Sequence, residues 1–149
     1  MAEGCFGSAM TYEVALAMLE RDGRWLLQLR DDLDTIIHPG HWGLFGGHLD
    51  PGETPEQAVM RELQEEISWA PQSTPSLWFS DDSGTRIAHV FRGQLEVPID
   101  HLNLLEGQDL KLASLEELIT GEVWSEKRRE HRPIAPGLDV VIQRLQSQS

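Results

Sequence analysis

The chain is poor in cysteine and has no long apolar run, and each shortage excludes a class of protein. Cys5 is the only cysteine among 149 residues, so no internal disulfide can form and a reducing, cytoplasmic location is expected. No apolar stretch reaches the roughly 18 residues that a membrane helix needs. The first ten residues also lack the basic and apolar regions of a secretory signal. We therefore expect neither membrane insertion nor export.

Basic residues are scarce as well. The chain has 12 lysines and arginines against 25 aspartates and glutamates, which gives a formal net charge of −13. Nucleic acid is not an expected partner, because binding its phosphate backbone requires a basic surface. A small nucleotide remains possible as a substrate, because Mg²⁺ ions can bridge its phosphates to carboxylates of the protein.

The length and the hydrophobic pattern indicate one domain with a mixed fold. A chain of 149 residues, 40% of them hydrophobic, can bury one core, so we expect a single domain over 1–149 with flexible ends at 1–10 and 146–149. The segments 31–41 and 123–136 are expected to be irregular, and 42–49 to hold a short extended piece. Strands are predicted at 12–19, 25–30, 76–80, 85–95 and 110–113, and helices at 55–67, 114–119 and 138–145. Strand pairs interleaved with helices favour an α/β fold in which a mixed sheet lies between helices.

The stretch from Gly47 to Trp69 combines a glycine-containing loop with an acidic helix. Thr54 is a good N-cap, Pro55 suits the first helical position, and Gln57 completes a capping box. The helix that follows has one apolar face for packing. Its members recur at helical spacing and are Ala58, Val59, Leu63 and Ile67.

The other face of this helix concentrates negative charge. Glu62, Glu65 and Glu66 lie at positions i, i+3 and i+4, so their carboxylates are neighbours and repel one another. Arg61 lies four residues before Glu65 and can also reach back to Glu53 in the loop. Hard divalent cations such as Mg²⁺ prefer oxygen ligands and offset such repulsion. The pattern therefore predicts a cation site on this face.

The spacing of these residues resembles the signature box of the Nudix hydrolases. Gly47 is followed after five residues by Glu53, and after seven more by the run RELQEE at 61–66. Six identities at fixed spacing are expected by chance at a frequency on the order of 10⁻⁵ in a chain of this length. The stretch 52–66, GETPEQAVMRELQEE, is also similar in wording to the MutT-like branch. The resemblance implies the α/β/α sandwich of that family.

Two positions depart from the family pattern. Ser68 stands where the family usually has a glycine that ends the helix, and Phe45 stands where it usually has proline. A left-handed Ser68 would carry a modest strain, or else the helix ends differently. Neither departure removes a carboxylate.

The resemblance also implies roles for individual residues. Glu53 and Arg61 are expected to pair and hold the loop against the helix. Glu106 is included among the ligands because 105–108 resembles the EGQ stretch of the MutT-like branch, although an ordinary loop acid is the alternative. Which carboxylate serves as general base is left open. A Mg²⁺ site, with Mn²⁺ as an alternative, is expected to be formed by Gly46 through its carbonyl, Glu62, Glu65, Glu66 and Glu106.

The implied reaction is hydrolysis of a pyrophosphate bond in a nucleoside diphosphate linked to another group. A nucleoside triphosphate giving monophosphate and pyrophosphate is favoured, with Arg30 and Gly47 as substrate-binding residues. A sugar-nucleotide or ADP-ribose hydrolase is the first alternative, although Gly84 stands where ADP-ribose hydrolases carry a proline. The second alternative is a nucleotide-sensing module without activity. The sequence leaves the choice between monomer and homodimer open.

Overall fold

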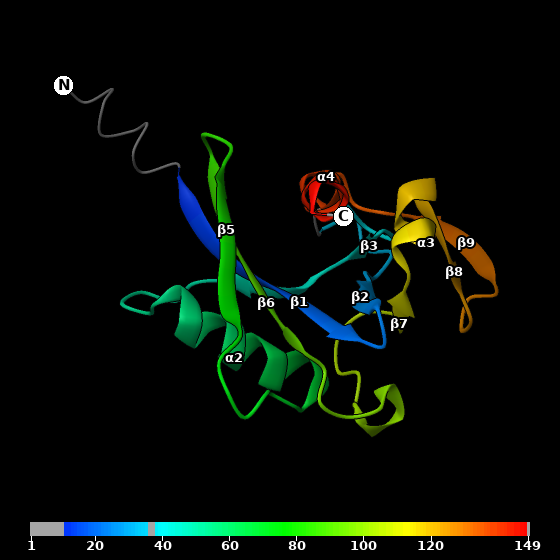
Figure 1. Ribbon diagram of the computed structural model, residues 1–149, viewed down its shortest axis with the longest axis horizontal. Coiled ribbons are helices and arrows are strands. Elements are labelled where there is room, and N and C mark those ends of the chain that lie inside the picture. The colour runs from blue at the N-terminus through cyan, green and yellow to red at the C-terminus, as the bar shows by residue number, and fades with distance from the viewer. Residues whose placement is uncertain (1–10, 36–37, 149) are drawn as a thin grey trace.

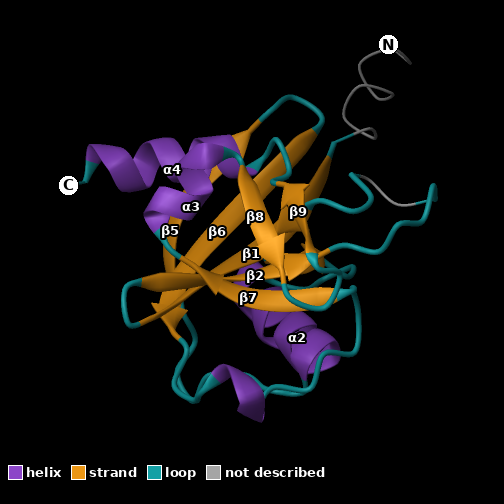
Figure 2. Cartoon of the chain, turned by 90° about the vertical axis from the view of Figure 1, so that its right-hand side faces the viewer, coloured by secondary structure: helices purple, strands orange, loops and turns teal. Residues whose placement is uncertain are grey.

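A mixed β-sheet lies between helices and forms the centre of the molecule (Figure 1). The computed structural model describes residues 11–35 and 38–148, so the flexible segment expected at 1–10 lies outside the described residues. Helix α2 (Pro55–Ile67) covers one face of the sheet and helix α4 (Leu138–Ser147) covers the other (Figure 2). The expected α/β/α sandwich is confirmed.

Strand β1 organises the seven-stranded sheet. It runs parallel to β6 on one side, and on the other it pairs antiparallel first with β4 and then, at its end, with β2. Strands β3 and β7 extend the sheet from β2, and β5 forms a hairpin with β6. The strands are β1 (Tyr12–Arg21), β2 (Arg24–Leu29), β3 (Trp42–Gly43), β4 (Phe45–His48), β5 (Ser76–Asp82), β6 (Arg86–Gln94) and β7 (Asp109–Ala113).

Each face of the sheet has its own apolar core. Under α2, Leu63 and Ile67 are fully buried against Phe45 and Phe91. Under α4, the buried residues include Leu138, Val141, Ile142, Leu145 and Trp42. The short helices η1 (Ile99–His101) and α3 (Leu115–Thr120) flank these layers.

The local signals of the acidic helix are confirmed in detail. Thr54 caps α2, and its side chain accepts from the Gln57 backbone while the Gln57 side chain accepts from the Thr54 backbone. Ser68 adopts a left-handed conformation with φ of 53°, so serine here takes the backbone geometry for which the family uses glycine. Phe45 is buried in the core beneath α2.

The prediction of an irregular segment at 123–136 was wrong. Strands β8 (Glu122–Ser125) and β9 (Glu130–Pro133) form a separate two-stranded sheet. The interleaved charged residues hid these strands, although Val123 and Ser125 on β8 are buried and alternate with more exposed residues. Helix α4 continues to Ser147, two residues past its expected end, and the flexibility expected for 146–149 stays a prediction. Within the described ranges, no helix is long and apolar enough to cross a membrane.

Candidate active site

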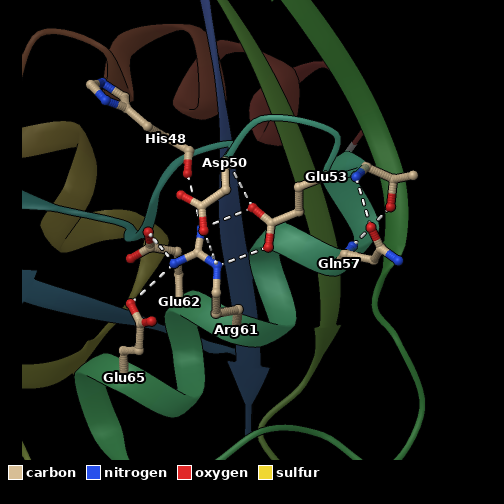
Figure 3. Close-up of polar contacts among 8 residues, drawn as sticks. His48, Asp50, Glu53, Gln57, Arg61, Glu62 and Glu65 are labelled. Carbon is tan, nitrogen blue, oxygen red and sulfur yellow. Dashed lines mark hydrogen bonds and ion pairs between the residues drawn. The ribbon is translucent and has the colours of Figure 1, made fainter.

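Arg61 binds the loop and the helix of the box together (Figure 3). Its Nε and Nη2 donate to the two carboxylate oxygens of Glu53 at 2.8 and 2.9 Å, and Nη2 also donates to the His48 carbonyl at 3.0 Å. Its Nη1 donates to Glu62 and Glu65, both at 3.1 Å. The predicted pairing of Arg61 with Glu53 and Glu65 is thus present in the structure.

Glu53 is held as a carboxylate by this arrangement. The Arg61 guanidinium, together with the Asp50 backbone N–H at 2.8 Å, lowers the pKa of Glu53 from 4.5 to about 2. Hydrogen bonds to the charged form of an acid favour that form. Glu53 therefore fixes the loop and is not available as a proton carrier near neutral pH.

A cavity of about 810 Å³ lies beside the box. Five acids line it, and three of them are predicted metal ligands. Glu62 and Glu66 come from α2, and Glu106 comes from the loop before β7. The loop is fixed against the helix because the Leu105 backbone N–H donates to the Glu66 carbonyl at 2.8 Å. Two segments some 40 residues apart thus bring their carboxylates to one cavity.

Glu66 is the acid whose environment is most unusual. Only 4% of its surface is exposed, and its Oε1 accepts from the Gly46 backbone N–H at 3.1 Å. Burial, followed by hydrogen bonding with Glu62 and by the negative charges of Glu62 and Glu106, raises the pKa of Glu66 well above its usual range. A buried carboxyl beside two other acids is a strong candidate for a cation ligand.

Gly46 and Gly47 lie in β4, and both are close to neighbouring groups. A Cβ at Gly47 would lie 2.6 Å from the nearer Glu62 oxygen. Gly46 has φ of 140°, and a Cβ there would collide with the Ala15 backbone carbonyl of β1. The close pairing of β4 with β1 therefore requires glycine at position 46, whereas a Cβ at position 47 would require the flexible end of Glu62 to move.

Glu65 differs from the other predicted ligands. Its side chain is 58% exposed and bonded to Arg61, and it does not line the cavity. The structure thus gathers Glu62, Glu66 and Glu106 but leaves Glu65 at the surface, so its role as a ligand stays a prediction.

The residues fit a hard divalent cation, although their carboxylates do not by themselves form a complete set of ligands. Within residues 11–35 and 38–148, no three acidic, histidine or cysteine side chains form a ready-made metal cluster. Glu62 is partly engaged by Arg61, and burial beside Glu62 raises the pKa of Glu66. Oxygen donors are the ones that Mg²⁺ requires, and a bound cation would favour the charged form of Glu66. Glu62, Glu66, Glu106 and Gly46 all line the cavity.

The predicted substrate-binding residues lie at the same cavity. Gly47 and Arg30 both line it. The Arg30 Nε is buried and has no hydrogen-bond partner among the residues that the structure describes. An unpaired buried donor is costly unless a ligand satisfies it, so Arg30 is a candidate for binding an anion.

Several cavity residues were not predicted. Gln28 donates from Nε2 to the Glu106 carbonyl at 3.0 Å and thereby supports the acid loop. Arg86 on β6 and Gly137 at the start of α4 also line the cavity. Nothing local marks them, because they reach the site through the pairing of β6 with β1 and the docking of α4.

Comparison with known proteins places this geometry in a family. The family model of the NUDIX domain matches residues 11–136. The chain is 38% identical over 77 residues to the nucleoside triphosphatase NudI of Escherichia coli, a match covering 49% of this chain and 52% of that protein. The chain therefore spans about half the length of this relative.

Solved structures show the same fold. The MutT protein from Methanosarcina mazei Go1 superposes with a TM-score of 0.69 at 21% identity, covering 93% of this chain and 94% of that one. The NUDIX domain of Shewanella oneidensis NrtR, in complex with ADP ribose, gives 0.66 at 20% identity, covering 93% and 88%. The chain belongs to the Nudix family and has a MutT-like fold.

Proposed function

We propose that the protein hydrolyses a pyrophosphate bond in a nucleoside diphosphate linked to another group, with Mg²⁺ or Mn²⁺ as cofactor. The observation that carries the proposal is the meeting of Glu62, Glu66 and Glu106 with Arg30 in one cavity beside the family's box. Carboxylates that bind cations and an arginine that binds phosphate are the two elements that a polyphosphate substrate requires.

Glu62, Glu66 and Glu106, with the Gly46 carbonyl, would hold the metal ions, and Glu65 would join them after leaving Arg61. The bound ions would neutralise phosphate charge and lower the pKa of the attacking water. The chain's own groups supply the positioning. Arg61 keeps the ligand-bearing helix against the loop, and the general base is one of the carboxylates at the cavity.

Arg30 would bind the substrate's phosphate chain. Its buried Nε supports this role, because a phosphate oxygen would satisfy a donor that the described part of the chain leaves unpaired. Gly47 would allow the phosphates to approach the backbone, since a side chain at this position would already collide with Glu62.

A nucleoside triphosphate is the favoured substrate. The similarity to a nucleoside triphosphatase supports this choice, although the match spans about half of that relative. An ADP-ribose or sugar-nucleotide hydrolase is the alternative, favoured by the ADP-ribose complex of the Shewanella structural neighbour. A nucleotide sensor without activity is the third possibility.

The decisive experiment measures phosphate and pyrophosphate release from a panel of nucleotides with and without Mg²⁺. We expect triphosphate turnover in the native chain and a loss of about 10²-fold or more in Glu66→Gln, because one truncated charge-stabilising group commonly costs that much. Glu56→Gln is the matched control, since Glu56 lies on the same helix, is exposed and does not line the cavity. No turnover of any substrate, with a nucleotide still raising the melting temperature, would favour the sensor.

A further inference from the structure

The cavity contains basic residues as well as acids, although the chain as a whole is strongly acidic. Arg30, His38 and Arg86 line the same cavity as Glu62 and Glu66. They come from three separate places, namely the end of β2, the loop that follows it and the start of β6. In a chain of net charge −13, the gathering of three basic residues at one cavity requires an explanation.

The two arginines have no acidic partner in the described part of the chain. The ion pairs there involve Arg61, Arg132, Lys111 and His89, and none involves Arg30 or Arg86. Asp31 and Asp81 also line the cavity, yet neither is bonded to these arginines. The positive charge of both arginines is therefore available to a ligand that enters the cavity.

The basic residues lie close enough to influence one another. Although His38 is exposed, partial desolvation of its ring and the positive charges of His41, Arg30 and Arg86 lower the pKa of His38. Mutual repulsion of this kind is relieved when an anion binds between the groups.

Arg86 occupies a defined place at the start of α4. Its Nη2 lies 3.5 Å from the position that a Cβ would take on Gly137, so the guanidinium rests against the backbone at the beginning of that helix. Gly137 provides no side-chain cap for the helix. The positive end of the helix dipole therefore adds to the charge of Arg86.

Arg86 lies well away from the strand position of Gly46, whose backbone N–H donates to Glu66. It pairs with Tyr12 on β1, whereas Gly46 pairs with Leu16 on the same strand. Four residues of strand at about 3.3 Å each separate the two positions by roughly 13 Å along β1, and they lie on opposite sides of that strand. A single pyrophosphate at the carboxylates does not span that distance, whereas a longer polyanionic substrate extends further toward Arg86.

We propose that Arg86, together with Arg30 and His38, forms a second anion subsite that binds a phosphate group of the substrate other than the pyrophosphate held at the carboxylates. The proposal rests on the proposed function and narrows its substrate class. It selects nucleotides with a third phosphate over nucleoside diphosphates linked to a neutral sugar. Arg86 is thus a specificity-determining residue.

The first test compares two substrates in two variants of the full chain. Arg86→Gln and Arg24→Gln change the net charge equally, but Arg24 is exposed at the β1–β2 turn and does not line the cavity. We expect the ratio of kcat/KM for a nucleoside triphosphate to kcat/KM for a nucleoside diphosphate sugar to fall at least tenfold in Arg86→Gln and to stay unchanged in Arg24→Gln. An equal fall for both substrates in Arg86→Gln overturns the proposal.

The second test needs neither turnover nor metal, so it stands even when the proposed function fails. Inorganic phosphate is titrated into the metal-free chain in EDTA, and the backbone amide signal of Gly137 is followed by NMR. We expect saturable shifts in the native chain and in Arg24→Gln, and binding at least tenfold weaker in Arg86→Gln. Binding of equal strength in Arg86→Gln, or no binding in the native chain, overturns the subsite.

Discussion

Arg61 shows how one residue can position several acids. Its donors lie in a rigid plane, so two of them meet Glu53 side by side while the others reach Glu62, Glu65 and the His48 carbonyl. A lysine has the same charge but no planar set of donors. The geometry of the box therefore depends on the guanidinium and not on positive charge alone.

Arg61→Lys is predicted to weaken both the fold and the site. Losing the paired bonds to Glu53 should lower the free energy of unfolding by about 1–3 kcal/mol, the usual range for hydrogen bonds to charged groups. The loop should also loosen, so Mg²⁺ affinity should fall several-fold. Urea denaturation and metal titration measure the two effects, with Arg24→Lys as control. Unchanged stability and unchanged Mg²⁺ affinity in Arg61→Lys would show that a positive charge at position 61 is sufficient to hold the loop and the helix together.

Glu53 should make the stability of the chain depend on acid pH. Its pKa is about 2 in the folded protein against an ordinary 4.5, so its contribution is complete above pH 4.5 and is lost as pH falls toward 2. We expect the native chain to be more stable than Glu53→Gln at pH 7. The difference should shrink below pH 4.5 and vanish near pH 2 in denaturant titrations across pH. A difference that is constant with pH would contradict the role of its carboxylate.

At the scale of elements, the helices and strands that could be predicted are those marked by residues close together in the sequence. The capping boxes at Thr54 and Ser114 mark the starts of α2 and α3, because each depends on residues three positions apart. The β8–β9 hairpin was missed because its evidence is pairing across the turn, such as Trp124 opposite His131. The Glu53–Arg61 pair was predictable from loop and helix spacing, whereas the route of Arg86 into the cavity was not.

Ser68 ends α2 in a conformation that suits glycine better. A non-glycine residue in the left-handed region costs about 1–2 kcal/mol, which the greater freedom of an unfolded glycine partly offsets. Ser68→Gly should therefore stabilise the chain by about 0.5–1 kcal/mol in urea denaturation. Ser73→Gly is the matched control, because Ser73 is exposed and is not among the positive-φ residues. Equal changes in the free energy of unfolding for Ser68→Gly and Ser73→Gly would show that the Ser68 backbone is not strained.

The loop that carries His38 is tied to β9 by an ion pair. Arg132 donates from Nη1 and Nη2 to the two Asp32 oxygens at 2.9 and 3.2 Å and also contacts Glu130 and the Gly40 carbonyl. Asp32→Asn and Arg132→Gln should each raise KM several-fold with little change in kcat, because the cavity wall becomes mobile. In a double-mutant cycle the two changes should couple by about 0.5–1 kcal/mol. Strictly additive effects would show that the pair does not hold the loop.

At the scale of the molecule, the fold brings opposite charges into one cavity. Its predicted metal ligands reach it from α2 and from the loop before β7, and its arginines come from β6 and from the residue that follows β2. Only the acids of the box share a local pattern, so only they stand out along the sequence. Long-range pairing places the others, with β1 pairing β6 over some 70 residues for Arg86 and β2 pairing β7 for Glu106.

Mg²⁺ should stabilise the whole chain if the acids at the cavity bind it. A ligand at 100 times its Kd adds about 2.7 kcal/mol to the free energy of unfolding when it binds only the folded state. We therefore expect the melting temperature to rise with MgCl₂ in the native chain and in Glu56→Gln. The rise should be largely lost in Glu66→Gln, because that carboxyl is buried among the other acids at the cavity. NaCl at equal ionic strength separates binding from screening of the −13 charge. If NaCl raises the melting temperature equally, or if Glu66→Gln keeps the rise with MgCl₂, the acidic helix is a solvated surface that binds no metal.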